Sequence, residues 1–192
     1  MSGLEELFTK YGTDKGIWGY TPAYEEHLWS KHKDIKNILE IGICGFRDIP
    51  NNVVGASLFA WRDYFPNAFI FGLDNDGRFI FHDQHRIITH RCDAYSPELD
   101  GFLGRYGHIR FDFICDDAVH DPVPQMHLVR KLWPFLAPGG VYAIEEARPY
   151  KVPDNDLGTH LVLPLMREFR DMIATEYTTH KPERLVVLTK AD

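Results

Sequence analysis

The chain has 192 residues, 44% of them hydrophobic and 26% charged, which is typical of a soluble globular protein and predicts a single domain over residues 1–192. A formal net charge of −7 without any basic run argues against nucleic acid as the main partner. The sequence shows neither the roughly 18 consecutive apolar residues of a membrane-spanning helix nor a signal-peptide pattern at Met1 to Glu6, so we expect a cytoplasmic protein with no membrane partner.

Apolar runs alternate with helical patterns along the chain, which favours repeated βα units and a largely parallel sheet. Only three residues separate the last two predicted strands, too few for a parallel crossover, so these two strands must form an antiparallel hairpin. We therefore expect an α/β fold with a sheet of seven strands, mostly parallel. The predicted strands are 37–43, 68–74, 86–92, 111–117, 140–146, 176–180 and 184–190, and the predicted helices are 21–31, 57–64, 77–82, 97–106, 122–136 and 159–174.

Small and acidic residues follow the first three predicted strands, at the sheet edge where parallel α/β folds bind nucleotides. Gly42 and Gly45 would let the backbone approach a ligand after the first strand. Asp74 ends the second strand, where a carboxylate suits the hydroxyls of a ribose, and Asp93 with Ala94 follows the third strand near an expected adenine. Taken singly, Asp74 could be a turn or cap residue and Gly42 a tight turn. The glycines do not open a helix directly, which disfavours a nicotinamide oxidoreductase.

A second group of acidic residues follows the next two predicted strands. Asp116 and Asp117 end the fourth strand, and Glu145 and Glu146 end the fifth. Because neighbouring strands of one sheet end at the same edge, these carboxylates would meet there and repel one another, and a divalent cation is the common neutraliser. Oxygen ligands suit magnesium, calcium or manganese. The pattern predicts a metal site with His120 beside it.

Each of these residues also has an ordinary structural explanation. Asp117 or Asp121 could cap the helix that follows. His120 is one of ten histidines in the chain. Glu145 and Glu146 could be surface residues, and because neighbours on a strand point to opposite faces, both can bind one ion only if the strand has ended. Taken jointly, the residues favour the metal site.

Four segments, taken in order, resemble the class I S-adenosylmethionine-dependent methyltransferases. They are Leu39-Glu40-Ile41-Gly42, Gly72-Leu73-Asp74, Asp112-Phe113-Ile114-Cys115-Asp116-Asp117 and Leu136-Ala137-Pro138-Gly139-Gly140. More narrowly, the segments 11–15 and 57–66 and the Asp-Asp-x-x-His element resemble metal-dependent sugar O-methyltransferases of the macrolide-antibiotic type, whose relatives include cephalosporin hydroxylase-like proteins. The match runs from about Tyr11 to Glu146.

The resemblance implies a Rossmann-like fold and a role for each candidate residue. Asp117, Glu145 and Glu146 would bind Mg²⁺, and His120 would be the general base, with Asp117 beside it as the second catalytic residue. The residues implied for S-adenosylmethionine are Glu40, Gly42, Gly45, Asp74, Asp93, Ala94 and Asp116, joined by Lys15 and Tyr20.

Two flanking segments are expected to cover the site. Residues 1–36 would form an N-terminal segment and helix over the cofactor, with Lys15 or Tyr20 reaching the carboxylate of its methionine part. The other explanation for the turn-rich stretch 11–20 is a plain connector. The loop 147–158, rich in Pro, Asp and Asn, is a predicted lid, and Trp18 and Tyr150 are the aromatic residues expected nearest a ligand.

The chain departs from the family pattern at two places. Ala118-Val119 stands where relatives usually carry Gly-Ser, and Glu145-Glu146 stands where they usually carry Glu-Asp. A glutamate reaches one methylene further than an aspartate, so the departure at Glu146 would shift the metal and leaves its identity open.

The expected function is S-adenosylmethionine- and Mg²⁺-dependent O-methylation of a hydroxyl of a sugar or glycoconjugate. A sugar hydroxyl is a poor nucleophile, so an enzyme must lower its pKa, as a coordinated cation can, or remove its proton with a general base as the bond forms. The sequence leaves open a catechol-type small-molecule O-methyltransferase, a non-catalytic cofactor-binding accessory module, and association into a homo-oligomer.

Overall fold

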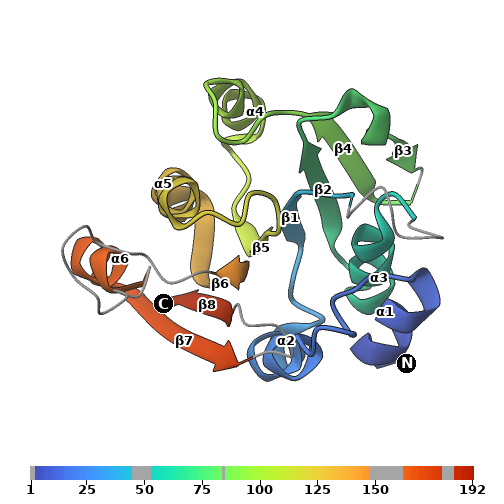
Figure 1. Cartoon of the computed structure of the whole chain (residues 1–192), viewed down its shortest axis with the longest axis horizontal. Coiled ribbons are helices and arrows are strands. Elements are labelled where there is room, and N and C mark those ends of the chain that lie inside the picture. The colour runs from blue at the N-terminus through green and yellow to red at the C-terminus, as the bar shows by residue number, and fades with distance from the viewer. Residues whose placement is uncertain (1–2, 45–52, 84, 148–161, 179–183) are drawn as a thin grey trace.

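The computed structural model describes residues 3–44, 53–83, 85–147, 162–178 and 184–192. They form one mixed sheet of eight strands in the order β3-β4-β2-β1-β5-β6-β8-β7 (Figure 1). The strands are β1 (Asn37–Ile41), β2 (Phe69–Asp74), β3 (His82–Asp83), β4 (Ile87–Arg91), β5 (Phe111–Asp116), β6 (Leu136–Ala147), β7 (Met172–Thr178) and β8 (Arg184–Lys190). The α-helices are α1 (Leu4–Tyr11), α2 (Thr21–Leu28), α3 (Ala56–Tyr64), α4 (Glu98–Tyr106), α5 (Pro122–Leu132) and α6 (Val162–Glu168), with 3₁₀ turns at Trp29–Lys31, Gly77–Phe79 and Trp133–Phe135.

Helices cover both faces of the sheet. On one face, α1, α2 and α3 pack on residues such as Ile38, and on the other face α4, α5 and α6 pack on residues such as Leu39 (Figure 1). Because the sheet is buried on both faces, the central strands read as continuous apolar runs rather than alternating ones. This arrangement leaves the carboxyl edge of the parallel strands open for a site.

All seven predicted strands are present, and the predicted pairing is confirmed. The neighbouring pairs β1·β2, β1·β5, β2·β4 and β5·β6 are parallel, while β8 pairs antiparallel with both β6 and β7. The eighth strand, β3, is a two-residue edge strand that pairs antiparallel with β4. It replaces the end of the helix predicted at 77–82, which is wrong beyond its first turn. Asp76 caps that turn by accepting a hydrogen bond from the Arg78 backbone, and the chain then pairs with the sheet.

The helix predicted at 159–174 is wrong in its second half. The described helix ends at Glu168, and β7 begins at Met172 and pairs along its whole length with β8. Ile173, Thr175 and Tyr177 are β-branched or aromatic residues that suit a strand. Tertiary pairing with β8 therefore decides the conformation where the helical pattern was ambiguous.

The helix α1 was not predicted. Leu4, Leu7 and Phe8 are buried at helical spacing, and Gly12 ends the helix in the left-handed conformation with φ of +74°. None of the helices in the described ranges combines the length and apolar character that crossing a membrane requires. The predicted lid, except for Ala147, lies outside the described residues.

Candidate functional site

A cavity of about 610 Å³ opens at the carboxyl ends of β1, β2, β4 and β5. Four of the residues predicted to bind the cofactor line it, namely Gly42, Asp74, Asp93 and Ala94. Gly45 lies outside the described residues. The remaining wall is formed by Ile41, Cys44, Leu73, Asn75, Asp76, Phe79, Cys92, Tyr95, Asp117, Ala118, Val119 and Pro124.

Gly42 makes the floor of this cavity possible. It follows β1 with φ of +83°, and a Cβ atom at this position would lie 2.2 Å from the Asp117 carbonyl oxygen. Its N–H donates to the Leu73 carbonyl at 2.9 Å, and the Asp117 N–H donates to the Ile41 carbonyl at 2.9 Å. The turn is thus held between β2 and β5 with no room for a side chain, which requires glycine.

Asp74 has the turn role considered from its sequence position, and it also lines the cavity. Its Oδ2 accepts from the Ile43 N–H at 3.2 Å and its Oδ1 accepts from the Asp76 N–H at 2.9 Å. The side chain therefore ties the turn after β1 to the turn after β2. It also faces the cavity, where each carboxylate oxygen retains a second lone pair for a ligand hydroxyl.

Asp116 lies behind the cavity wall rather than in it. Its side chain is fully buried, and Tyr95 donates a hydrogen bond to its Oδ1 at 3.0 Å. Burial raises the pKa of Asp116 to about 7, against the opposing effect of the Tyr95 hydroxyl. Tyr95 itself lines the cavity and was missed from the sequence, although it directly follows Asp93-Ala94. Asp116 therefore supports Tyr95 and does not line the cavity.

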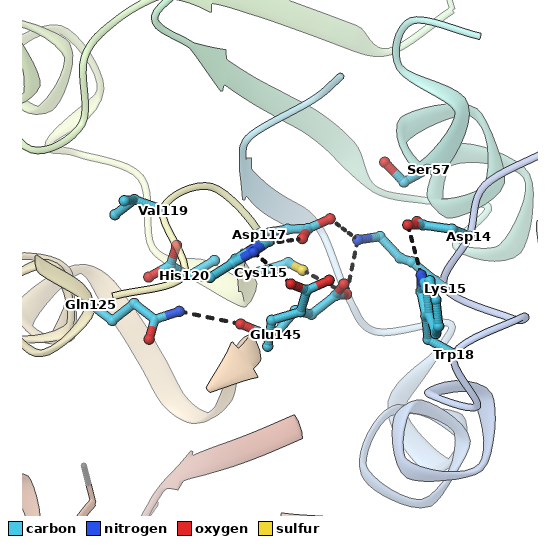
Figure 2. A network of polar contacts seen from close by, with 12 residues as sticks. Asp14, Lys15, Trp18, Ser57, Cys115, Asp117, Val119, His120, Gln125 and Glu145 are labelled. Carbon is cyan, nitrogen blue, oxygen red and sulfur yellow. Dashed lines mark hydrogen bonds and ion pairs between the residues drawn. The ribbon is translucent and has the colours of Figure 1, made fainter. Parts of the chain in front are cut away.

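Beside the cavity lies a group of buried charges that we call the acid cluster, made of Glu40, Asp117 and Glu145 around Lys15. The Lys15 Nζ lies 2.6 Å from Oδ2 of Asp117, 2.8 Å from Oε1 of Glu145 and 3.3 Å from Oε1 of Glu40. Figure 2 shows its side chain reaching in from the N-terminal segment between Asp117 and Glu145. Only 1% of the Lys15 side chain is exposed. The carboxylates come from β1, β6 and the end of β5, so one ammonium joins three strands.

Side chains from α2, α3 and β5 surround the acid cluster. Glu40 accepts from Ser57 Oγ and from Trp61 Nε1, each at 2.7 Å. The Tyr24 hydroxyl donates to Glu145, and the Cys115 thiol lies 3.4 Å from the same carboxylate. These partners were missed from the sequence, because tyrosine, serine and tryptophan on helices are more often core or surface residues than parts of a polar site.

Burial and mutual repulsion set the ionisation of the acid cluster. Burial raises the pKa of Glu145, and the neighbouring Asp117 raises it further. Burial also opposes ionisation of Asp117, but Lys15 and His120 outweigh that effect and lower its pKa. Burial lowers the pKa of Lys15, yet Asp117, Glu145 and Glu40 more than compensate and hold it well above its ordinary value. Lys15 is therefore a fixed positive charge among carboxylates that exceed it in number.

His120 joins this group through Glu146. The Nδ1 atom of His120 lies 2.6 Å from Oε2 of Glu146, and its Nε2 lies 3.6 Å from Oδ1 of Asp117. Glu146 has φ of +49°, and the pairing of β6 with β8 shifts register between Ile144 and Ala147. The strand has not ended at these glutamates, as the sequence reasoning required, because β6 runs to Ala147, but this one-residue bulge breaks its regular alternation. Asp121, not Asp117, caps α5, by accepting from the Val123 N–H at 2.9 Å.

The three predicted metal ligands are close together but do not meet at one point. Asp117 and Glu145 face Lys15, whereas Glu146 faces His120. Within the described ranges, no group of three or more His, Cys, Asp or Glu side chains is arranged to hold a metal ion. A single cation, the Lys15 ammonium, takes the position between the first two ligands.

The remaining predicted residues lie around the same site. Glu40 and Lys15 belong to the acid cluster and do not line the cavity. Tyr20 is buried against Tyr24, with ring centroids 6.4 Å apart, and its hydroxyl has no hydrogen-bond partner among the described residues. Trp18 donates from Nε1 to Asp14 at 2.9 Å. Tyr150 lies outside the described residues.

The sequence is similar to sugar O-methyltransferases of antibiotic biosynthesis. It is 34% identical over 149 residues to 8-demethyl-8-(2-methoxy-alpha-L-rhamnosyl)-tetracenomycin-C 3'-O-methyltransferase of Streptomyces olivaceus, covering 74% of this chain and 36% of that protein. The mycinamicin VI 2''-O-methyltransferase of Micromonospora griseorubida is 34% identical over 147 residues, covering 74% of this chain and 35% of that protein. The aligned part is thus about a third of the length of these relatives. No family model matches the chain.

Solved structures give the same relationship. The MycE methyltransferase from the mycinamycin biosynthetic pathway, in complex with Mg, SAH and mycinamycin VI, superposes with a TM-score of 0.76 at 26% identity and covers 99% of this chain and 54% of that one. Human methyltransferase-like protein 13, in complex with SAH, shares the fold alone, with a TM-score of 0.61 at 17% identity over 85% of this chain and 75% of that one. The chain therefore belongs to the class I S-adenosylmethionine-dependent methyltransferases and, among them, resembles the sugar O-methyltransferases of antibiotic biosynthesis.

Proposed function

We propose that the chain transfers the methyl group of S-adenosylmethionine to a hydroxyl of a sugar or glycoconjugate, with Mg²⁺ bound beside His120. The observation that carries the proposal is the position of Asp117. Asp117 lines the cavity. Its carboxylate contacts Lys15 through Oδ2 and lies near His120 through Oδ1. A cofactor bound in the cavity and an acceptor hydroxyl bound beside His120 would therefore both lie next to Asp117.

The cavity has the features that an adenosyl group requires. Gly42 removes the side chain that would fill its floor, and Asp74 places a carboxylate where ribose hydroxyls can donate. Ala94, Val119 and Pro124 provide apolar surface on which a purine can lie. When bound, S-adenosylmethionine would supply a methyl group on a sulfonium that leaves as the neutral thioether S-adenosylhomocysteine.

The acid cluster has the chemistry of a divalent-cation site. Its carboxylates offer hard oxygen donors, and a buried cation already lies between two of them in the form of the Lys15 ammonium. Asp117 and Glu145 would hold Mg²⁺, and the third predicted ligand, Glu146, would orient His120 beside them. When bound, Mg²⁺ would stabilise the alkoxide that develops on a coordinated sugar hydroxyl.

His120 would remove the hydroxyl proton. The 2.6 Å contact with the Glu146 carboxylate keeps a proton on Nδ1, so Nε2 is the nitrogen that accepts one. During methyl transfer, Nε2 of His120 would take the hydroxyl proton while the thioether leaves. Glu146 and Asp117 stabilise the imidazolium that results. The surrounding residues then act by positioning, which can contribute about 7 to 11 kcal/mol to such reactions.

A methyl-transfer assay over glycosides and catechols, with and without EDTA, tests the proposal. Transfer to a glycoside hydroxyl that stops with EDTA and returns with Mg²⁺ is the expected result. His120→Gln should lose activity while keeping the fold, and His127→Gln, an exposed histidine on α5, is the matched control. Transfer that is indifferent to chelation would remove the metal from the mechanism, and transfer to catechols alone would reassign the substrate. Cofactor binding without any transfer would leave an accessory module.

A further inference from the structure

Lys15 reaches the acid cluster from outside the sheet. The segment 12–20, which we call the Lys15 turn, lies between α1 and α2 and is bracketed by Gly12 with φ of +74° and Gly19 with φ of +79°. Within it, the Trp18 N–H donates to the Asp14 carbonyl and the Tyr20 N–H donates to the Lys15 carbonyl. The Lys15 turn is thus an ordered unit with a left-handed glycine near each end, where the backbone can change direction.

The ammonium of Lys15 uses the oxygens that a metal would need. Oδ2 of Asp117 and Oε1 of Glu145 lie 2.6 and 2.8 Å from Nζ and come from the neighbouring strands β5 and β6 at the sheet edge. Mg²⁺ binds carboxylate oxygens at about 2.0 to 2.1 Å. An ion bound to either oxygen would lie within about 5 Å of Nζ, where the two positive charges repel in a buried setting. Lys15 and the ion would therefore compete for the same oxygens.

Charge favours the exchange of one cation for the other. Three acidic side chains surround a single ammonium in the acid cluster, so two negative charges would stay uncompensated once all three had ionised. A dication brings one more positive charge to the same oxygens. Lys15, once released, has a long flexible side chain that can carry its ammonium to water. In the absence of metal, the same ammonium keeps the carboxylates together in a buried setting where they would otherwise repel.

Building on the proposed function, we propose that Lys15 competes with the divalent cation for the same carboxylates. Lys15 thereby sets the metal affinity of the site, and metal binding displaces the Lys15 turn. The proposal makes Lys15 a specificity-determining residue for the cation. It predicts opposite effects of Lys15 on the two states: Lys15 stabilises the metal-free protein and weakens metal binding.

Titration calorimetry with Mg²⁺ and with Mn²⁺ tests the competition. Lys15→Met, which keeps the length and removes the charge, should bind either ion at least tenfold more tightly than the wild type. Lys10→Met is the matched control, because Lys10 lies at the end of α1, is exposed, and pairs with Asp63 away from the acid cluster. Its metal affinity should equal that of the wild type. If Lys15→Met folds only with metal, the rise of its Tm with added Mg²⁺ should exceed that of the wild type, which reports the same difference.

Tryptophan fluorescence gives the second readout. Trp18 lies in the Lys15 turn, so Mg²⁺ should change the emission of the wild type more than that of Trp18→Phe, in which Trp61 still contacts Glu40 of the acid cluster. Metal-free Lys15→Met should already show the emission of the metal-bound wild type. Equal or weaker metal binding by Lys15→Met, or a Trp18 signal that ignores Mg²⁺, would overturn the competition. If neither the wild type nor any variant binds Mg²⁺ or Mn²⁺, the proposed metal site itself is wrong.

Discussion

Oε2 of Glu146 lies 2.6 Å from Nδ1 of His120, and the backbone that places it there has the left-handed φ of +49°. The contact orients the imidazole and decides which nitrogen carries the proton. It exists because a bulge in β6 turns Glu146 out of the regular strand alternation.

Glu146→Gln tests this orienting role. An amide cannot stabilise the imidazolium as a carboxylate does, so methyl transfer should fall by about 10- to 100-fold. Glu146→Asp restores the residue usual in the family and also tolerates positive φ, so it should retain far more activity than Glu146→Gln. Rates at saturating substrate, with circular dichroism to confirm the fold, check the order. Equal activity of the two variants would contradict the role given to the carboxylate.

Gly42→Ala tests the floor of the cavity. A left-handed residue with a Cβ atom costs about 1 to 2 kcal/mol, and the 2.2 Å overlap with the Asp117 carbonyl adds to this cost. We expect lower stability in urea and no measurable binding of S-adenosylhomocysteine. Gly101→Ala, in α4 with nothing within 4 Å of the added atom, is the control and should stabilise by about 0.5 to 1 kcal/mol. If Gly42→Ala were as stable as Gly101→Ala and still bound S-adenosylhomocysteine, Gly42 would not be required for the floor of the cavity.

Asp74→Asn tests the ribose contact. The amide oxygen can still accept one backbone N–H, but the charged acceptor facing the cavity is lost, which is worth about 1.5 to 3 kcal/mol. S-adenosylhomocysteine should therefore bind at least tenfold more weakly in calorimetry. Asp112→Asn is the matched control, because Asp112 accepts from the Lys36 and Asn37 N–H groups at 2.7 and 2.9 Å near the start of β5, at the other edge of the sheet. Equal loss of binding in both variants would point to general destabilisation instead.

Trp61→Phe tests the support of the acid cluster. The ring packing is largely kept, but the buried Glu40 loses one of its donors, so the free energy of unfolding should fall by about 1 to 3 kcal/mol. Trp133→Phe should cost less, because its partner Asp171 is only partly buried. In the double variant that combines Trp61→Phe with Glu40→Gln, the fall in the free energy of unfolding should be smaller than the sum of the two single losses. Additive losses would mean that Trp61 and Glu40 act independently.

The sequence was most informative where a site residue follows directly from its strand. Gly42, Asp74 and Asp93 sit at strand ends, and parallel strands bring their ends to one edge, so period and turn chemistry were enough to place them at the cavity. The same reasoning brought Asp117 and Glu145 together. It could not place the eighth strand, because two residues carry no periodicity.

What the sequence could not show depends on long-range contacts. Lys15 meets Asp117 and Glu145 across 102 and 130 residues of chain, and no local pattern distinguishes a buried lysine from an exposed one. The partners Ser57 and Trp61 lie on one helix, α3. The spacing of the apolar residues in that helix predicts only which of its faces packs against the core. The segment from Met172 forms a strand because it pairs with β8 along its whole length.

The most direct test of the central claim is a crystal structure of the protein with S-adenosylhomocysteine and Mn²⁺, with anomalous scattering used to find the metal. We predict the nucleoside in the cavity against Gly42 and Asp74, and one Mn²⁺ bound by Asp117 and Glu145 beside His120, with Lys15 withdrawn. Density for the nucleoside elsewhere, or no anomalous peak at these carboxylates while Lys15 keeps its contacts, would contradict the account.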